Sequence, residues 1–248
     1  MIPKIIHYCW FGGQDKPKLA HKCIESWKKF FPQYEIIEWN ENNFNINQVP
    51  FVREAYDAKK FAFVSDYARL WCIYNYGGVY FDTDVEVISS MDDILAKGGY
   101  MAFERHEIDP EYRGFVNPGL GFAAQKHNPI VQDIMNFYKQ AHFISDDGTE
   151  NKITIVLVTT NILKSYGLKD SSTPLTLSHG LTIYPWEYFC PIEYPFKKVH
   201  ITPETRTIHH YGESWMTVNE KARMRVGAFF ATQFGKVIKC LMRRVFLR

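Results

Sequence analysis

Apolar and polar positions in the first forty residues switch between strand-like and helix-like spacing. Residues 2–10 predict a strand, residues 19–31 carry a helical stripe of apolar side chains, and residues 34–39 alternate like a second strand. The pair Gly12-Gly13 marks a turn after the first strand. A strand–helix–strand succession of this length is typical of a βαβ unit, in which ligands bind at the carboxyl ends of parallel strands.

A longer helical pattern covers residues 61–76 and stops at two consecutive glycines, which terminate helices at little cost. Residues 79–81 follow as a short strand of β-branched and aromatic residues. Asp82 and Asp84 stand at its carboxyl end, separated by a single threonine. This helix, turn and strand form the stretch around which the candidate chemistry gathers.

The rest of the body continues to mix helical and extended patterns. We expect helices at residues 52–60, 91–95 and 130–143 and extended segments at residues 85–88 and 100–103. Residues 153–158 have the composition of a buried strand. The succession predicts an α/β fold.

Composition supports one folded domain. Of the 248 residues 46% are hydrophobic and 16% aromatic, which excludes a disordered chain. Five cysteines, an odd number without Cys-x-x-Cys spacing, favour reduced thiols over disulfides or a zinc site. The chain has neither the apolar segment of a signal peptide nor a run of membrane-spanning length, so we expect a cytoplasmic protein.

The formal net charge of +2 hides a basic tail. Residues 219–248 hold eight lysines and arginines but one acidic residue, with apolar residues near helical spacing. This pattern predicts a basic amphipathic helix on an anionic membrane surface, at the inner face of the cell membrane. Docking on the body or an oligomer interface are the alternatives. We therefore expect a catalytic domain over residues 1–218 and a tail over 219–248, with no nucleic-acid surface in the body.

The spacing of Asp82 and Asp84 indicates a metal site. Two nearby carboxylates repel each other unless a cation lies between them, and in an extended segment residues two apart point the same way. Oxygen ligands suit Mg²⁺ or Mn²⁺, which bind phosphates. Asp66 and Arg69, three residues apart, add an acid and a cation on one helix face. The alternative is a solvated turn with a local ion pair.

These residues resemble the signature of glycosyltransferase family 32. That family includes bacterial capsule and lipopolysaccharide sugar transferases and fungal initiating mannosyltransferases, and it is similar to the catalytic domain of the large clostridial glucosylating toxins. The resemblance rests on the following residues: Ser65, Asp66, Arg69, Gly77, Gly78, Tyr80, Asp82 and Asp84. It implies a GT-A type, Rossmann-like nucleotide-binding fold with a central mixed sheet flanked by helices, and a helix at residues 153–158.

The resemblance also implies an activity. The expected reaction is metal-dependent, retaining transfer of a hexose from a nucleotide-diphosphate sugar, with UDP favoured, to a glycan or lipid-linked acceptor in surface polysaccharide synthesis. Mn²⁺, or Mg²⁺, would be held by Asp82, Asp84 and His210, which we prefer to His209. Asp66 and Arg69 would bind hydroxyls of the donor sugar.

Further substrate contacts follow from the same resemblance. Tyr80 would pack beside the donor sugar, and Trp10 would stack on the base. Asn117 is a candidate for a sugar-hydroxyl contact, although a turn-forming Asn-Pro accounts for it equally well. Ser214 and Trp215 would close over the diphosphate.

Two rival functions use the same residues. A phosphohydrolase of the haloacid dehalogenase type also has a DxD motif, but on its first strand, whereas here the motif lies a third of the way along the chain. A non-catalytic sugar- or membrane-binding protein with a decayed site is the second rival. The presence of all four charged residues of the motif, Asp66, Arg69, Asp82 and Asp84, argues against it.

Overall fold

The computed structural model describes residues 1–105, 114–193 and 198–212 of the chain, and the predicted tail over 219–248 lies outside them. The first elements are the predicted βαβ unit. Strand β1 (Ile5–Cys9) pairs in parallel with β2 (Glu35–Trp39), and α1 (Lys18–Phe30) connects them. The apolar stripe of α1 buries Cys23 and Trp27 against one face of the sheet.

Helix α3 (Phe61–Tyr76) has the bounds that the pattern predicts, and α2 (Pro50–Asp57) precedes it. Gly77 ends α3 with a φ of +67°, which glycine adopts without the clash that a Cβ atom causes. Strand β3 (Gly78–Tyr80) then pairs in parallel with β1. The carboxyl ends of β1 and β3 therefore lie side by side, where ligands of parallel sheets bind.

Seven of the described strands form one mixed sheet in the order β2-β1-β3-β6-β5-β8-β7. Its remaining strands are β5 (Gly99–Ala102), β6 (Phe122–Ala124), β7 (Leu175–Thr176) and β8 (Leu181–Tyr184). Two small sheets accompany it, one of β4 (Val85–Val87) with β11 (Thr207–His209) and one of β9 (Ile192–Glu193) with β10 (Lys198–Val199). Strand β6 runs antiparallel to both of its neighbours, which makes the sheet mixed.

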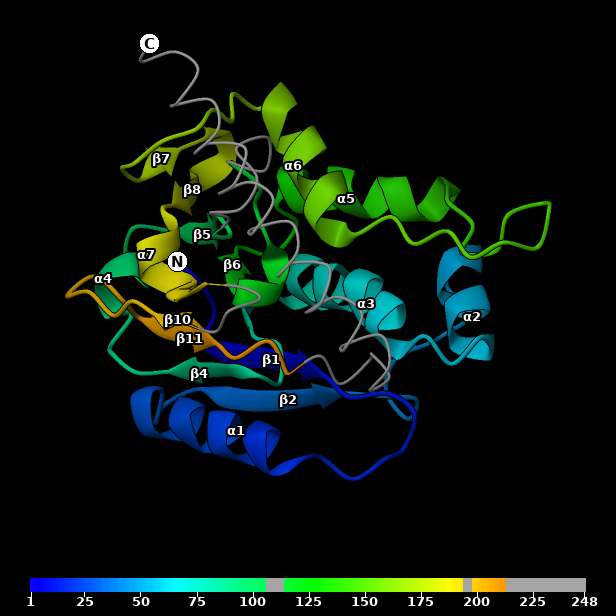
Figure 1. Ribbon diagram of the computed structural model, residues 1–248, viewed down its shortest axis with the longest axis horizontal. Helices are drawn as coiled ribbons and strands as arrows, with labels where there is room; N and C mark the ends of the chain where they lie inside the picture. The colour runs from blue at the N-terminus through cyan, green and yellow to red at the C-terminus, as the bar shows by residue number, and fades with distance from the viewer. Residues whose placement is uncertain (106–113, 194–197, 213–248) are drawn as a thin grey trace, which may run out of the picture.

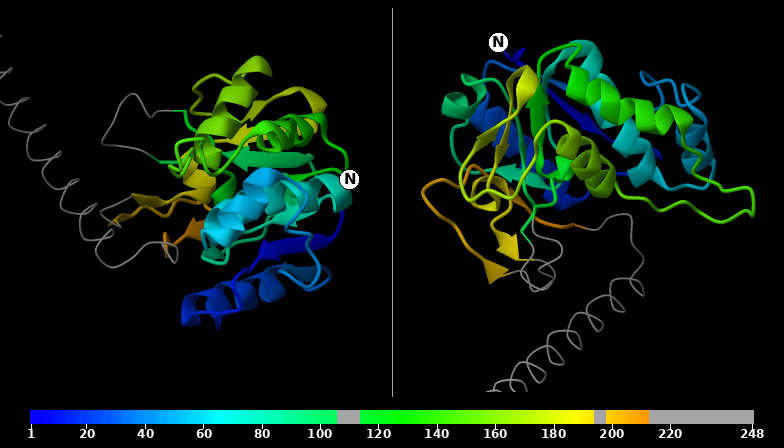
Figure 2. Two further views of the ribbon diagram at one scale, coloured as in Figure 1. Left: turned by 90° about the vertical axis from the view of Figure 1, so that its right-hand side faces the viewer. Right: turned by 90° about the horizontal axis from the view of Figure 1, so that it is seen from above.

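Helices cover both faces of this sheet (Figures 1 and 2). One buried cluster lies under α2, α3, α5 (Pro129–Gln140) and α6 (Ile155–Ser165). The other lies under α1, α4 (Asp92–Leu95), α7 (Trp186–Phe189) and the β4–β11 pair. The predicted α/β fold of GT-A type, with a central mixed sheet flanked by helices, is confirmed in its sheet and its layers.

Residues 153–158 show how context decides between helix and strand. Their β-branched composition suits a strand, but most of the segment belongs to α6, whose first turn is capped by the Thr154 hydroxyl. The helix that the family resemblance implies is therefore present. Within the described ranges, no helix is both long enough and apolar enough to cross a bilayer.

Buried His7 ties three elements of the scaffold together. The indole Nε1 of Trp39 donates to its Nδ1 at 3.0 Å, so the proton lies on Nε2, which donates to the carbonyl of Gly77 at 2.8 Å. Burial lowers the pKa of His7 to about 4, against the opposing effect of the bond to Gly77. The ring thereby joins β1, the end of β2 and the carboxyl terminus of α3.

Candidate functional site

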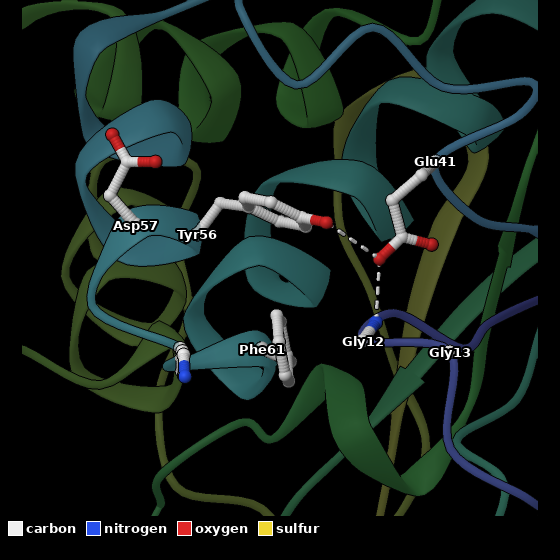
Figure 3. A pocket seen from close by; sticks show the side chains of 7 residues that line it. Gly12, Gly13, Glu41, Tyr56, Asp57 and Phe61 are labelled. Atoms are coloured by element: carbon white, nitrogen blue, oxygen red, sulfur yellow. Dashed lines mark hydrogen bonds between the residues drawn. The ribbon is translucent and has the colours of Figure 1, made fainter.

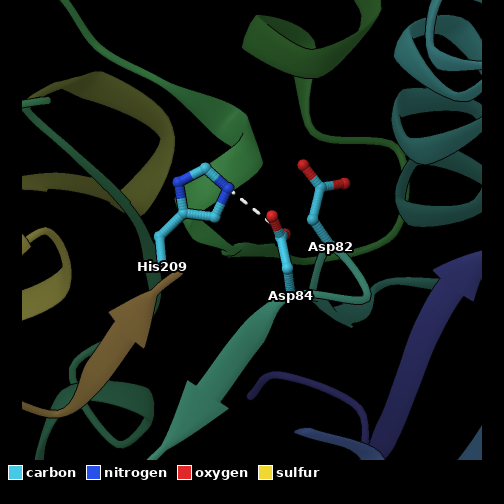
Figure 4. Close-up of side chains that lie close together, drawn as sticks. All are labelled: Asp82, Asp84 and His209. Atoms are coloured by element: carbon cyan, nitrogen blue, oxygen red, sulfur yellow. Dashed lines mark ion pairs between the residues drawn. The ribbon is translucent and has the colours of Figure 1, made fainter. Parts of the chain in front are cut away.

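A tight turn after β3 carries the two aspartates of the motif. The amide of Val85 donates to the carbonyl of Asp82 at 3.0 Å, so residues 82–85 form a turn rather than the extended segment that we expected. The turn still brings the carboxylates of Asp82 and Asp84 to one side, as Figure 4 shows. Their proximity, which the sequence predicted from strand geometry, therefore arises from the turn.

Arg69 joins the helix to this turn. Its guanidinium lies 3.0 Å from the carboxylate of Asp66 and 3.3 Å from that of Asp82, and it lies over the Tyr80 ring with a separation of 5.1 Å. Tyr80 donates its hydroxyl to the other oxygen of Asp82 at 2.8 Å. Asp66 and Arg69 are 8% and 5% exposed, so this network is buried and each charge has a partner.

The histidine beside the aspartates is His209, which corrects the prediction of His210. Strand β11 pairs antiparallel with β4, and this register places His209 opposite Val85 and its Nε2 3.2 Å from Asp84 (Figure 4). Side chains alternate along an extended segment, so His210 points elsewhere. Its Nε2 lies 2.7 Å from Glu86.

The pKa values of the two aspartates are shifted in opposite directions. Burial raises the pKa of Asp82 despite Arg69 beside it, and Asp84 contributes to the same direction. Burial also acts to raise the pKa of Asp84, but His209 and the Gly212 amide, which donates to Asp84 at 2.8 Å, outweigh it and hold that pKa below its usual range. Burial raises the pKa of Asp66 to about 7, although Arg69 opposes the shift.

The ligand atoms fit a divalent cation. One carboxylate oxygen each from Asp82 and Asp84 and one ring nitrogen of His209 lie within 4.8 Å of one another. The Nδ1 of His209 is buried, and no described residue makes a hydrogen bond with it. Two carboxylates with an imidazole suit Mn²⁺ better than Mg²⁺, which prefers oxygen ligands and water.

Asn117 is held within the fold. Its Oδ1 accepts from the amide of Gly119 at 2.7 Å, and its Nδ2 donates to Glu104 at 3.2 Å. These bonds favour the turn-forming account of Asn117 over a sugar contact. The turn itself adjoins the motif, because a Cβ atom on Gly119 would lie 2.7 Å from Oδ2 of Asp82.

Glu104 is a neighbour of the site that the sequence did not reveal. Its Oε1 accepts from Asn117 and, at 3.0 Å, from the hydroxyl of Tyr211, whose ring packs 4.3 Å from that of His209. Nothing in the sequence marks Glu104 as a link between two distant segments of the chain. It connects the turn at Asn117 to the strand that carries His209.

The remaining predicted substrate contacts are Trp10, Ser214 and Trp215. The partly buried ring of Trp10 packs against the core on the α1 side of the sheet, and its Nε1 donates to the carbonyl of Gln14 at 2.5 Å. Stacking of Trp10 on a base stays a prediction. Ser214 and Trp215 lie outside the described residues, so their placement at a diphosphate also stays a prediction.

Residues 17–100 match the family described as "Glycosyltransferase sugar-binding region containing DXD motif". The matched region contains α3, β3 and the turn with Asp82 and Asp84. His209 lies outside it and reaches the motif only through the pairing of β11 with β4.

Curated relatives come from Schizosaccharomyces pombe. Inositol phosphoceramide mannosyltransferase 3 is 29% identical over 153 residues, which cover 57% of this chain and 40% of that protein. Inositol phosphoceramide mannosyltransferase 2 is 31% identical over 146 residues, with the same coverage. The chain thus spans less than half the length of the curated relatives that it matches.

Among solved structures, the PaToxG glycosyltransferase is 18% identical with a TM-score of 0.49, covering 66% of this chain and 69% of that one. A glycosyltransferase involved in glycosylation of the major capsid of PBCV-1 is 12% identical with a TM-score of 0.48, covering 90% and 100%. The predicted resemblance is confirmed over residues 17–100, which match the sugar-binding region described for glycosyltransferases that contain a DXD motif.

Proposed function

We propose that this chain is a metal-dependent glycosyltransferase that moves a hexose from a nucleotide-diphosphate sugar to an acceptor. The observation that carries the proposal is the convergence of Asp82, Asp84 and His209 beside the buried Arg69–Asp66 pair. The names of the curated relatives favour mannose as the sugar transferred. A transferase of this kind needs to hold a diphosphate, a sugar and a nucleoside along one edge of the sheet.

The residues of the chain divide this work. Asp66, with a pKa of about 7, is able to accept or donate a hydrogen bond to a donor-sugar hydroxyl at neutral pH. Arg69 orients Asp66 and Asp82 by contacting both, and Tyr80 holds the second oxygen of Asp82. The network is formed before any ligand binds, which reduces reorganisation during the reaction.

Asp82, Asp84 and His209 would hold the cation, and Mn²⁺ fits this set best. When bound, the cation supplies Lewis-acid neutralisation of the charge that builds on the departing diphosphate. Before it binds, the His209–Asp84 pair keeps the Asp84 carboxylate ionised and fixed in place.

The acceptor and setting are also part of the proposal. A lipid-linked acceptor is supported by the names of the relatives, which refer to inositol phosphoceramide. Retention of anomeric configuration, a role in surface polysaccharide synthesis and a cytoplasmic location at the membrane surface rest on the sequence resemblance and on the basic tail over residues 219–248.

The test measures release of nucleoside diphosphate from nucleotide sugars with and without Mn²⁺. We expect slow hydrolysis of one donor in the presence of Mn²⁺ and its loss in Asp84→Asn, whereas Asp92→Asn, which neutralises an exposed aspartate of α4, behaves like wild type. Nucleotide binding that ignores both Mn²⁺ and Asp84 would contradict the proposal and favour a binding protein. Release of inorganic phosphate would favour a phosphohydrolase.

A further inference from the structure

A cavity of about 510 Å³ lies beside the carboxyl end of β1, within the size range of small-molecule sites (Figure 3). Its walls come from the loop after β1, from Glu41 shortly after β2, from the end of α2 and from the start of α3. Neither the metal cluster nor Trp10 lines it. The residues that line the cavity are therefore different from those of the charged cluster, and nothing described so far accounts for it.

Two aromatic side chains form one part of the wall. The rings of Tyr56 and Phe61 lie 5.5 Å apart at an angle of 61°. Gly12 makes room for Phe61, because a Cβ atom at residue 12 would lie 2.3 Å from the Phe61 ring. An aromatic wall of this kind offers stacking and edge contacts to a planar heterocycle.

A carboxylate faces the same cavity. Oε1 of Glu41 accepts from the amide of Gly12 at 2.6 Å and from the hydroxyl of Tyr56 at 3.2 Å, as Figure 3 shows. These two bonds fix the side chain and leave Oε2, to which no described residue donates. Because an ionised carboxylate accepts hydrogen bonds and donates none, a ligand that binds to Oε2 needs hydrogen-bond donors.

The cavity is placed for one end of a long ligand whose other end reaches the charged site. Helix α3 begins with Phe61 at the cavity and carries Arg69 eight residues later, about 12 Å along the helix axis at 1.5 Å per residue. Strand β1 makes the same connection, since Cys9 at its end lies close to Arg69 and Tyr80 and Gly12 follows three residues later. A nucleoside attached to a diphosphate spans such a separation.

We propose that this cavity binds the nucleobase of the donor and that Glu41 makes it selective for guanine. This inference rests on the proposed transferase function. Guanine presents two adjacent donors, N1–H and the N2 amino group, which converge on a single acceptor, so both can bond to Oε2 of Glu41 with charge-assisted strength. Uracil presents one N–H between two carbonyl oxygens, which repel the carboxylate, and adenine places an acceptor beside its amino group. The UDP donor expected from the sequence is thereby replaced by a GDP-sugar.

The test is calorimetry on the full chain with GDP, inosine diphosphate and UDP, each with Mn²⁺. We expect GDP to bind at least tenfold more tightly than UDP. Inosine diphosphate lacks only the N2 amino group, so we expect it to bind about tenfold more weakly than GDP, a comparison that needs no variant.

Glu41→Gln keeps an oxygen for Gly12 and Tyr56 but replaces the acceptor Oε2 with an amide NH2, which donates. We expect it to bind GDP about 10- to 100-fold more weakly, to bind UDP no more weakly than wild type does and to make GDP and inosine diphosphate equivalent. The matched control is Glu25→Gln, which makes the same substitution at an exposed residue of α1 that does not line the cavity. We expect this control to bind every nucleotide as wild type does.

Three outcomes would overturn the base assignment. They are tighter binding of UDP than of GDP, equal binding of GDP and inosine diphosphate to wild type, and equal losses for GDP and UDP in Glu41→Gln, which would place Glu41 on the ribose. The proposed transferase function fails separately, if binding ignores Mn²⁺ and Asp84→Asn. Guanine selectivity that depends on Glu41 would survive that failure.

Discussion

The charged cluster of Asp66, Arg69, Asp82, Asp84 and His209 and the cavity at Glu41 lie at the same edge of one sheet, yet they are built in opposite ways. In the cluster, buried and half-buried acids and bases contact one another across helix, turn and strand. In the cavity, the carboxylate of Glu41 is held through one oxygen only. In the cluster each charged side chain has an oppositely charged neighbour, whereas the cavity has an acceptor left for a ligand.

This difference suits the cluster to the proposed transfer reaction and the cavity to selection among nucleotides. A cluster whose charged side chains hold one another in place keeps its geometry without a substrate, as the proposed transfer reaction requires. A site with an unused acceptor gains most from the ligand that supplies matching donors, so it discriminates among bases. We therefore expect damage to the cluster to lower stability and all binding, and damage to the cavity to change which nucleotide binds.

The largest effect is expected from Arg69→Met. The change leaves the buried carboxylate of Asp66 and the half-buried carboxylate of Asp82 without their cation, and breaking a buried ion pair costs about 3–5 kcal/mol of unfolding free energy. Urea denaturation measures this loss. Arg53→Met is the control, because Arg53 pairs with Asp57 at an exposed site worth about 0.2–1 kcal/mol. Equal losses in the two variants would contradict the distinction between buried and exposed pairs.

The second effect concerns His7, which lies on β1, the strand whose carboxyl end adjoins both the charged cluster and the cavity. The unfolded imidazole has a pKa of 6.5 and the folded one about 4, so between these values the unfolded chain binds more protons. The contribution of neutral His7 to the free energy of unfolding is therefore fully present above pH 6.5. It is lost as the pH drops toward 4, which lowers the free energy of unfolding by up to about 3 kcal/mol. Denaturation at pH 7.5 and pH 4.5 measures it. His7→Gln does not titrate, and an unchanged acid dependence in this variant would refute the assignment.

The smallest effect on stability, about 1–3 kcal/mol, is expected from Gly12→Ala, which drives a methyl group into the Phe61 ring. Calorimetry should show weaker nucleotide binding with unchanged binding of Mn²⁺ alone. Gly13→Ala is the matched control: its φ is also positive, at +65°, but a Cβ atom there meets nothing within 4 Å. If both variants lose nucleotide binding equally, the Phe61 wall is not the cause.

Local patterns predicted the elements near the cluster because their signals are local. The apolar spacing, the two glycines and the short apolar strand define α3 and β3 within a continuous stretch of sequence. The four charged residues of the motif were identifiable for the same reason. The shape of the turn at residues 82–85 was not, since the sequence alone does not show where a short strand ends.

Features formed by distant segments escaped prediction. The choice between His209 and His210 depends on the register of β11 against β4, and a shift of one residue exchanges the two side chains. Glu41 belongs to a polar segment that looks like a surface loop, and only folding brings it to Gly12 and Tyr56. Residues 153–158 follow the same rule, because packing against α5 makes a helix from strand-like residues.

The pairing of β4 with β11 also sets the stage of folding at which His209 joins Asp82 and Asp84. The bond between Asp84 and the amide of Gly212 closes a separation of 128 residues, so the metal cluster is completed by one of the last described segments of the chain. Contacts of such long range form late, because the intervening chain must lose its freedom first. During synthesis, a ribosome-bound chain that already displays both aspartates lacks the histidine, so the proposed cation site and the proposed transfer reaction require that the remainder has emerged and folded.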